Sequence, residues 1–398
     1  MKALILTNEY PPYIYGGAGV HVEYLTREMS KLIGVDVRCF GDQAADKEPL
    51  KVRGYSVDQK MVEDSEKKLK SLFSALYNCI SFNVTPIDAD VVHCHTWYTH
   101  FGGILAKKSY GIPLVITTHS LEPLRPWKRE QLGLGYDASM WVEKTALEMA
   151  DAIIAVSEGM KRDIVELFNV NEDKIEVIYN GIDTEEYYPV KEKEALAQYG
   201  INPDRPYVLF VGRITRQKGI IHLVNAIEHI DAGAQIVLCA GQPDTPEIKH
   251  EMEEGIKSIK RDNVIWIQKM VSKKEVIQLY THASVFCCPS IYEPFGIINL
   301  EAMACETPVV ASAVGGIVEI IEDGQTGFLV RFDQHKESPF EPLSPAEFSA
   351  DLAEKINIIL ADKHLAEEMG RKGRLRAEKS FSWKAIAAQV VNLYGKLV

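Results

Sequence analysis

The stretch YVLFVGRITRQKG, Tyr207–Gly219, decides the fold class of this chain. It opens with a run suited to a buried strand, Tyr207–Val211, passes through a basic loop bounded by glycines, and leads into a helical pattern. The same order, a short β-branched run followed by an amphipathic stretch, recurs along the whole sequence. Such alternation predicts βαβ units that build parallel, doubly wound sheets. We therefore expect an α/β fold.

The chain is too long for one compact core. It has 398 residues, whereas single cores stop growing at about 250–300 residues. The strand pattern also falls into two series, separated near residues 185–205 by turn residues and a charged stretch. We predict two Rossmann-like domains, 1–190 and 191–381, that face each other across a cleft.

The chain should end in a helix, 382–398, that follows a basic turn at Arg371–Arg376. Two helices that cover the first sheet are expected at Gly19–Leu32 and Ser139–Ala150. The expected strands are Lys2–Leu6, Val35–Phe40, Val91–His95, Leu114–Thr118, Ala152–Val156 and Ile175–Ile178 in the first domain, and Tyr207–Val211, Gln235–Ala240, Val264–Gln268, Val285–Pro289, Pro308–Ala311 and Phe328–Val330 in the second.

Charge and hydropathy argue against two classes of partner. Lys and Arg total 44 against 56 Asp and Glu, a net charge of -12 that opposes general adhesion to nucleic acid or anionic lipid. No apolar run reaches about 18 residues, so we expect no membrane-spanning segment. The run Ala3–Leu6 is too short for a signal peptide, and the seven cysteines lack paired spacing. We expect a cytoplasmic protein with reduced core thiols and leave homo-oligomer formation open.

Two cations follow the strand that opens the second domain. Arg213 and Lys218 lie near its carboxyl end, just before a helix, where they could neutralise a diphosphate. The alternative is a solvated basic turn. In an acidic protein, a basic pair at the ligand-binding edge of a sheet favours an anionic ligand.

A pair of glutamates follows the predicted strand Val285–Pro289. Glu293 lies in the loop and Glu301 in the next helix, so their carboxylates can reach different parts of one ligand. In an enzyme that uses a sugar nucleotide, one could accept from sugar hydroxyls and the other from ribose hydroxyls. The N–H groups of Phe295 and Gly296 would then face the phosphate end. The alternative is a helix-terminal acid beside a surface glutamate.

Two features of the first domain suit ligand contact. The glycine loop Gly16–Gly19, with Gly17 inside it, stands at the start of a helix and could bring N–H groups close to a phosphate. A flexible turn before a helix would look the same. His119 follows a strand and could hydrogen-bond a hydroxyl or a phosphate, although a structural histidine is the alternative.

Two other patterns in the first domain are weaker. His93 and His95 flank a cysteine, but no further side chains complete a zinc set at the usual spacing. Asp88-Ala89-Asp90 has a metal-binding spacing but precedes its strand, so it points to the wrong end of the sheet. We therefore expect no metal site.

Longer motifs resemble one enzyme family along nearly the whole chain. The Glu293/Glu301 pair, the segment Gly212–Gly219 and the glycine loop are similar to the site pattern of the retaining GT-B glycosyltransferases of family 4. Within that family, three motifs look like those of the short bacterial glycogen synthases, including the α-maltose-1-phosphate synthases. These motifs are Glu9–Pro12 with Gly16–His21, His93–Tyr98, and His119–Lys128.

The resemblance implies a nucleotide-sugar donor, ADP-glucose in preference to UDP-glucose, a retained α-linkage and no bound cofactor. With no clear nucleophile, it implies front-face transfer, in which the departing diphosphate oxygen takes the acceptor proton. The implied roles are these: Arg213 and Lys218 hold the diphosphate with the Gly17 region near it, Glu301 holds the ribose, Glu293 contacts the donor glucose, Phe295 and Gly296 offer backbone N–H groups, His119 touches the transferred sugar, and Asn180 lies at a sugar site.

Three cations that follow His119 are candidates for binding the acceptor. Arg125, Lys128 and Arg129 would pair well with an acceptor phosphate, whereas a neutral glucan end has no need of them. Surface charge is the alternative. The resemblance allows both glucose 1-phosphate and an α-1,4-glucan end in glycogen biosynthesis, and we favour glucose 1-phosphate. Three other classes stay open: a sucrose- or sucrose-phosphate-type transferase, an epimerase, and a non-catalytic glucan- or nucleotide-binding protein.

Overall fold

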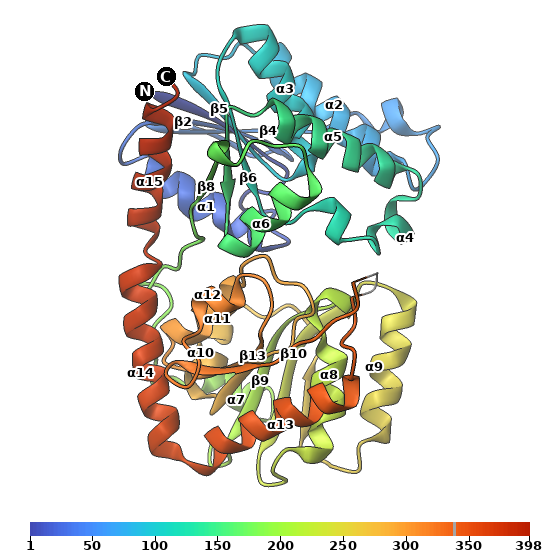
Figure 1. Cartoon of the computed structure of the whole chain (residues 1–398), viewed down its shortest axis with the longest axis vertical. Coiled ribbons are helices and arrows are strands. Elements are labelled where there is room, and N and C mark those ends of the chain that lie inside the picture. Colours follow the sequence, from blue (N-terminus) through green and yellow to red (C-terminus); the bar gives the residue numbers. More distant parts are fainter. Residues whose placement is uncertain (337–339) are drawn as a thin grey trace. The chain divides into compact units, whose positions relative to one another are not determined.

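Two compact units make up the chain. The computed structural model describes residues 1–336 and 340–398. One unit consists of Met1–Gly181 together with Trp383–Val398, and the other of Ile182–Ser382 (Figure 1). Each unit has a sheet of mainly parallel strands with helices packed on both faces. This architecture confirms the expected α/β fold with two doubly wound domains.

In the first unit, all of whose residues are described, eight strands form one sheet in the order β3-β4-β2-β1-β5-β6-β7-β8. Neighbouring strands run parallel except for β3, which is antiparallel to β4. The central strands are buried over nearly their whole length, as expected for a parallel sheet covered on both faces. The strands are β1 (Lys2–Thr7), β2 (Gly34–Phe40), β3 (Ala44–Lys47), β4 (Leu50–Tyr55), β5 (Val91–His95), β6 (Leu114–Thr118), β7 (Ala152–Ala155) and β8 (Ile175–Val177).

The helices of the first unit pack on both faces of this sheet. On one face, α1 and α15 share an apolar core with the sheet, and on the other α2, α3 and α5 pack together (Figure 1). The helical segments are α1 (Gly17–Met29), η1 (Gln59–Val62), α2 (Lys70–Val84), α3 (Trp97–Tyr110), η2 (Glu122–Leu124), α4 (Lys128–Leu132), α5 (Gly135–Met149), α6 (Glu158–Leu167), η3 (Glu172–Lys174) and α15 (Trp383–Gly395).

The sheet of the second unit has six parallel strands among the described residues, in the order β11-β10-β9-β12-β13-β14. Its order reverses between β9 and β12, the kind of position where doubly wound sheets bind ligands. The strands are β9 (Tyr207–Ile214), β10 (Gln235–Pro243), β11 (Val264–Ile267), β12 (Val285–Cys288), β13 (Val309–Ser312) and β14 (Gly327–Val330).

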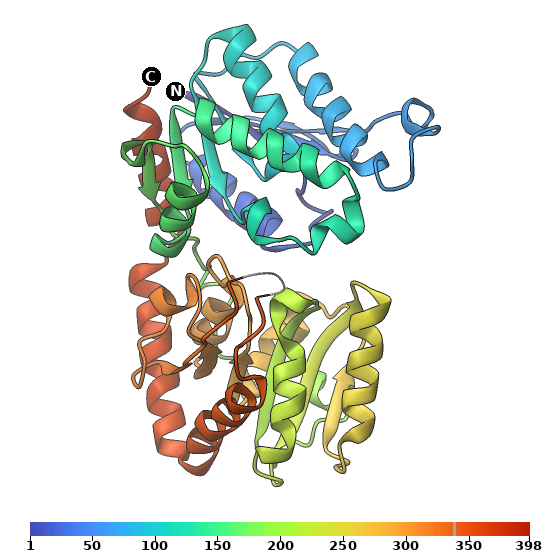
Figure 2. The same ribbon diagram turned by 45° about the vertical axis from the view of Figure 1, so that its right-hand side comes forward.

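Helices α8, α9 and α13 share the core on one face of this second sheet, and Figure 2 shows α8 and α9 side by side. On the other face, Tyr280 of α10 packs edge-on against Phe286 of β12. The helical segments are α7 (Glu194–Gln198), η4 (Arg216–Lys218), α8 (Ile220–Ala226), η5 (Ile227–His229), α9 (Pro246–Ser258), α10 (Lys273–His282), α11 (Ile297–Ala304), α12 (Ile317–Ile320), α13 (Pro345–Ala361) and α14 (Lys363–Ser380).

The C-terminal segment differs from the expectation in two ways. Arg371–Arg376 is not a basic turn but lies inside α14, because this amphipathic stretch buries Met369, Gly373 and Ala377. The final helix, α15, belongs to the first unit, where the Trp383 ring stacks on Tyr24 of α1. After Ser382 the chain therefore returns to the first unit.

The boundary between the units lies at Gly181/Ile182, earlier than the predicted hinge at 185–205. A physical reason is visible at Gly181, where an added Cβ would lie 2.6 Å from the Trp383 ring. Gly181 is thus packed under the returning helix as part of the first unit.

Every predicted strand overlaps an observed one, but β3 and β4 were not predicted. The residues of β3 are all exposed, so they carry no alternating apolar pattern. Asp90 accepts from the Lys2 backbone N–H at 2.8 Å, which places the Asp88–Asp90 segment at the start of β1 as expected. The cysteines are buried and free, and no described helix combines the length and apolarity needed to cross a membrane.

Candidate active site

The predicted site residues form two groups, one in each unit. In the second unit, Lys218 Nζ lies 2.5 Å from Glu293 Oε2. The Ser290 hydroxyl donates to the same oxygen at 3.2 Å. The two charged side chains are only 15% and 9% exposed, so each compensates a charge that would otherwise be costly to bury. The structure thus brings together two of the residues predicted from separate motifs.

Close backbone packing holds the loops that carry this pair. Gly219 has φ +58, and a Cβ there would lie 1.9 Å from the Pro289 carbonyl oxygen. The Ile291 N–H donates to the Gln217 carbonyl at 3.0 Å. These two contacts join the loop after β9 to the loop after β12, so Lys218 and Glu293 are positioned by one rigid substructure.

A third loop supports Glu293 from the side of β13. The Gly316 N–H donates to the Glu293 carbonyl at 3.0 Å. Gly315 has φ +49, and a Cβ there would lie 2.0 Å from the same carbonyl oxygen. Only glycine fits Gly315 without moving the Glu293 backbone.

Glu301 lies inside α11 and is hydrogen-bonded rather than ion-paired. The Tyr280 hydroxyl donates to Glu301 Oε2 at 3.0 Å. Burial raises the pKa of Glu301 to about 7, and hydrogen bonds from Tyr280 and Tyr187 oppose the shift. The Lys218 charge also lowers this pKa, which links Glu301 electrostatically to the Lys218–Glu293 pair.

The segment between the two glutamates is anchored by Phe295. Its side chain is 2% exposed and packs edge-on against Phe381. Gly296 is the N-cap of α11 at φ +106, and its carbonyl accepts from the Asn299 N–H at 2.9 Å. The turn is therefore fixed, while its predicted phosphate contact stays a prediction.

Arg213 has a partner that the sequence did not suggest. Its Nη1 lies 3.3 Å from Asp244 Oδ2, at the end of the adjacent strand β10. Arg213 is about one-third exposed, so a ligand phosphate can compete with Asp244 for it. Its predicted role at a diphosphate stays a prediction.

The candidate residues of the first unit gather around His119, directly after β6. His119 Nε2 and His95 Nδ1 lie 3.0 Å apart. His21 packs edge-on against His119, and its Nδ1 lies 2.7 Å from Asn180 Oδ1. Burial lowers the pKa of His119 well below its ordinary value, and the charges of His21 and other imidazoles act in the same direction. His119 is therefore neutral at physiological pH and can hydrogen-bond a hydroxyl.

These imidazoles are the only group of potential ligands in the described chain that could hold a metal ion, with ligand atoms of His21, His95 and His119 all within 4.8 Å of one another. His95 and His119 bond each other directly in this structure, and the expected absence of a metal site stays a prediction. His93 has a structural role, since it bonds the Tyr394 hydroxyl and Thr117 at 2.6 and 2.7 Å.

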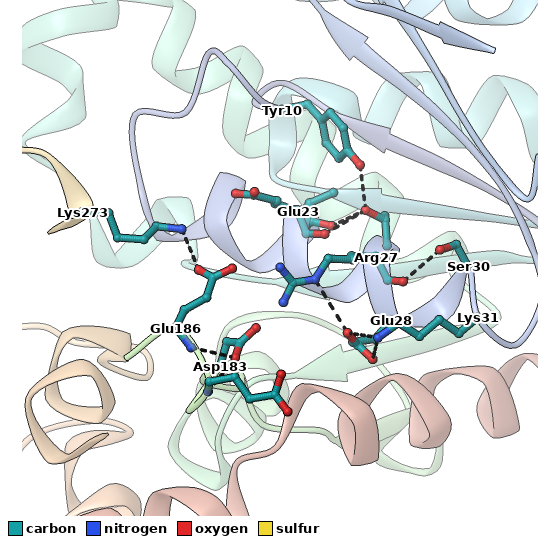
Figure 3. Close-up of polar contacts among 12 residues, drawn as sticks. Tyr10, Glu23, Arg27, Glu28, Ser30, Lys31, Asp183, Glu186 and Lys273 are labelled. Carbon is teal, nitrogen blue, oxygen red and sulfur yellow. Dashed lines mark hydrogen bonds and ion pairs between the residues drawn. The ribbon is translucent and has the colours of Figure 1, made fainter. Parts of the chain in front are cut away.

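The glycine loop before α1 is folded around an acidic side chain. The Glu9 carboxylate accepts from the N–H groups of Tyr15 and Gly16, each at 2.8 Å. The Tyr10 hydroxyl forms a hydrogen bond with Thr26 of α1 at 3.0 Å, which attaches the loop to the helix that follows it (Figure 3). In this structure the anion at the start of α1 is thus Glu9, and the predicted phosphate contact at Gly17, the first residue of the helix, stays a prediction.

The three cations that follow His119 all have partners. Arg125 Nη1 lies 3.1 Å from Ser120 Oγ and 3.4 Å from Glu122 Oε1. Lys128 Nζ donates to Gln131 at 3.0 Å, on an exposed turn of α4. Arg129 forms a two-point pair with Asp137. Arg125 is more enclosed than Arg129, with 17% of its side chain exposed against 50%.

The sequence did not indicate the side chains that contact the predicted site residues. Ser290 lies three residues before Glu293 in the same loop, and Asp244 directly follows strand β10. Their positions near strand ends were only a weak indication that they contact the site residues. A stronger indication of a buried polar contact lies in α5, where Glu143 interrupts the apolar face of the helix. The structure confirms that this side chain is buried, with 2% exposed.

Two models of known protein families match the chain, one over each half. Residues 15–186 match the family model described as "Glycosyltransferase Family 4". Residues 191–338 match the model described as "Glycosyl transferases group 1".

Full-length relatives agree with these matches. The chain is 44% identical over 407 residues to an α-maltose-1-phosphate synthase of Mycolicibacterium smegmatis, with 100% of both chains covered. It is also 44% identical over 403 residues to the α-maltose-1-phosphate synthase of Mycobacterium tuberculosis, again with full coverage of both. Among solved structures, sucrose-phosphate synthase from Thermosynechococcus elongatus superposes with a TM-score of 0.80 at 25% identity, covering 100% of this chain and 99% of the other.

Proposed function

We propose, from the premise that this chain belongs to the GT-B glycosyltransferases of family 4, that it moves glucose from ADP-glucose to glucose 1-phosphate and forms α-maltose 1-phosphate. The observation that carries the proposal is the 44% identity, over the full length, to enzymes named α-maltose-1-phosphate synthases. That name states the product of those relatives, and the geometry of both half-sites is compatible with the same chemistry here.

The second unit would hold the donor. Lys218 and Arg213 are the cations available to its diphosphate, and each now faces a carboxylate that a phosphate oxygen can replace. Glu293 would accept from hydroxyls of the donor glucose, while Glu301 would accept from ribose hydroxyls. Phe295 and Gly296 would present backbone N–H groups to the phosphate end.

The transfer itself would take place on one face of the sugar. The bond from C1 of glucose to the diphosphate oxygen breaks as the acceptor hydroxyl oxygen bonds to C1 on the same face, and the hydroxyl proton passes to the diphosphate oxygen. This route retains the α configuration without a protein nucleophile. Lys218 and Arg213 would stabilise the charge that develops on the leaving group, a type of contact whose removal costs about 3–4 kcal/mol.

The first unit would bind the sugar being transferred and the acceptor. Neutral His119, oriented by His95, can hydrogen-bond a hydroxyl of the donor glucose. Arg125 would be the cation for an acceptor phosphate, because Ser120 and Glu122 hold it through Nη1 and 17% of its side chain stays exposed. Lys128 would add a second, more exposed charge, and Asn180 would act by orienting His21.

A glucan end is the second candidate acceptor, and one observation favours it. Arg125 and Arg129 are paired with carboxylates, while Lys128 bonds the neutral Gln131, so two of the three charges are already compensated. A neutral α-1,4-glucan end would leave those contacts in place. Glycogen synthesis by direct extension is therefore the main competitor of maltose 1-phosphate synthesis.

The test is a product analysis with labelled ADP-glucose. The proposal expects ADP release that depends on glucose 1-phosphate, and a labelled disaccharide phosphate whose new anomeric carbon has the small proton coupling of an α-linkage. UDP-glucose should be a poorer donor. Label that enters glycogen but never a phosphorylated disaccharide would make glycogen synthase the correct function.

The same assay separates the remaining classes. Transfer to fructose or fructose 6-phosphate would indicate a sucrose-type enzyme, and epimerised donor without transfer would indicate an epimerase. Nucleotide binding without turnover would indicate a binding protein. EDTA should leave the rate unchanged, because we propose that Lys218 and Arg213 serve the diphosphate in place of a divalent cation. Loss of activity on chelation that Mg²⁺ restores would contradict this donor site.

A further inference from the structure

Helix α5 carries three polar side chains on its buried face. Tyr136, Ser139 and Glu143 are spaced at i, i+3 and i+7, so they line one side of the helix. They are 4%, 0% and 2% exposed. Buried polar groups are costly unless they are hydrogen-bonded, so such a stripe needs a partner of matching polarity.

That partner is Glu122, the first residue of η2. The Tyr136 hydroxyl donates to the Glu122 carbonyl at 2.5 Å, and the Glu122 N–H donates to Glu143 Oε2 at 2.8 Å. Ser139 Oγ lies 3.0 Å from Glu122 Oε2 and 2.8 Å from the Tyr136 carbonyl. One helix face therefore fixes both the backbone and the carboxylate of Glu122, which is 1% exposed.

The other carboxylate oxygen of Glu122 faces Arg125. Glu122 Oε1 lies 3.4 Å from Arg125 Nη1, and Ser120 Oγ lies 3.1 Å from the same nitrogen. The Nε of Arg125 is buried and bonds no described atom. The guanidinium is thus held through Nη1, while 17% of the side chain stays exposed to a ligand. Arginine binds phosphate best when its donors are presented in a fixed plane.

We propose that Glu122 is a positioning residue for the acceptor: its carboxylate fixes the Arg125 guanidinium so that the exposed part of this side chain meets the phosphate of glucose 1-phosphate. Tyr136, Ser139 and Glu143 in turn hold Glu122. This inference rests on the proposed function, because it takes Arg125 to be the acceptor phosphate contact. It adds four residues that touch no substrate themselves.

The charges of the cluster agree with this arrangement. Burial and the neighbouring Glu122 charge raise the pKa of Glu143 well above its ordinary value, which favours the protonated form of Glu143. Two ionised carboxylates beside Arg125 would repel an incoming phosphate, whereas one orients the cation at a lower electrostatic cost.

The experiment measures KM for each substrate in variants that loosen Glu122 without touching Arg125. Ser139→Ala and Tyr136→Phe each delete one hydroxyl and should raise KM for glucose 1-phosphate about five- to tenfold. The KM for ADP-glucose and kcat should stay within about twofold. Glu122→Ala should raise the acceptor KM further, and Glu122→Gln, which keeps an acceptor oxygen for Arg125, should recover part of the loss.

Matched controls lie in the second unit. Ser349→Ala deletes a serine hydroxyl that is 2% exposed and bonds a backbone carbonyl, as Ser139 does. Tyr207→Phe deletes a hydroxyl that bonds a backbone carbonyl at 2.6 Å, as Tyr136 does. Neither control should change the KM for glucose 1-phosphate by more than about twofold, whatever it does to stability.

The outcomes separate this inference from the function on which it rests. If the wild type makes the disaccharide phosphate and Arg125→Ala raises the acceptor KM, but Ser139→Ala, Tyr136→Phe and Glu122→Ala do not, the positioning role is wrong and the function stands. If the wild type does not accept glucose 1-phosphate, both are wrong. Should Glu122→Ala fail to fold, the acceptor KM values of Ser139→Ala and Tyr136→Phe still decide whether Glu122 positions Arg125.

Discussion

At the scale of single residues, the Lys218–Glu293 ion pair is the main contact of the candidate site in the second unit. Their 2.5 Å contact is largely buried, so removing one partner leaves a charge with reduced compensation, a change that can cost about 3–5 kcal/mol of stability. Activity losses at these positions must therefore be separated from unfolding.

Lys218→Ala and Glu293→Ala should each lower kcat at least about 100-fold, because each removes a preorganised contact to the transition state. Steady-state kinetics well below the unfolding midpoint would measure the effect. Lys107→Ala is the control, since it breaks a 2.6 Å ion pair with Asp151 in the first unit. Retention of more than a tenth of wild-type kcat in Lys218→Ala or Glu293→Ala would remove that residue from catalysis.

Glu301 should make stability depend on pH. Its folded pKa is raised by burial to about 7 from an ordinary value of 4.5, so the folded state binds the proton more tightly than the unfolded state. Stability should then fall as pH rises from about 4.5 to about 7 and level off above that. Glu301→Gln lacks this titration, so it should gain stability relative to the wild type between pH 5 and pH 8, while its KM for ADP-glucose rises.

Urea unfolding of both proteins at several pH values would measure this difference. A stability difference that is the same at pH 5 and pH 8 would show that Glu301 does not titrate in this range. A KM for ADP-glucose unchanged by Glu301→Gln would separately remove Glu301 from the ribose contact.

At the scale of elements, glycines allow the loops of the second unit to approach one another. Gly315→Ala places a Cβ where the Glu293 carbonyl now lies 2.0 Å away, so the loop must move. Displacements of about 1 Å near a reaction centre can cost about 100-fold in rate, and we expect a loss of that order in kcat/KM. Circular dichroism should stay native because both sheets are untouched.

Gly324→Ala is the matched control for this prediction. Gly324 also has a positive φ, +72, but an added Cβ there meets nothing within 4 Å. Both substitutions cost about 1 kcal/mol or more from backbone conformation, so only the contact with Glu293 distinguishes them. Equal losses of kcat/KM in the two variants would mean that general strain, not the Glu293 position, causes the effect.

The elements also explain which parts of the fold the sequence could predict. Strands such as β5 and β6 are buried on both faces, so they appear as apolar runs, and their predicted bounds match the structure. The β3–β4 hairpin escapes prediction because β3 is fully exposed. The basic turn expected at Arg371–Arg376 was wrong because a helix with a charged outer face can look like a turn when its narrow apolar stripe is overlooked.

The site could be predicted only in part, for a related reason. Motifs indicated Lys218 and Glu293 separately, but their contact joins residues 75 positions apart and becomes visible only when β9 and β12 pair. Asp244 beside Arg213 and Glu143 beside Glu122 likewise depend on tertiary packing. Residue types at strand ends indicate which side chains meet a ligand, while the partners that hold them depend on how the elements pack.

At the scale of the whole molecule, the chain completes its first unit with its last helix. Helix α15 returns after Ser382 and contributes Ile386, Val390 and Tyr394 to the core of that unit. The Tyr394 ring is 0% exposed, and its hydroxyl bonds His93 Nδ1 at 2.6 Å. The stability of the first unit therefore depends on residues that follow the second unit in the sequence.

Tyr394→Phe should test this dependence. The substitution keeps the ring but leaves His93 Nδ1 buried without a partner, which should cost about 1–3 kcal/mol in the free energy of unfolding. Tyr110→Phe is the control. Its hydroxyl makes one hydrogen bond, to the Asn83 carbonyl at 2.9 Å, but the residue is 41% exposed, so the substitution should change stability by less than about 0.5 kcal/mol. Urea unfolding would compare the variants, and equal stability of Tyr394→Phe and wild type would contradict a structural role for this contact.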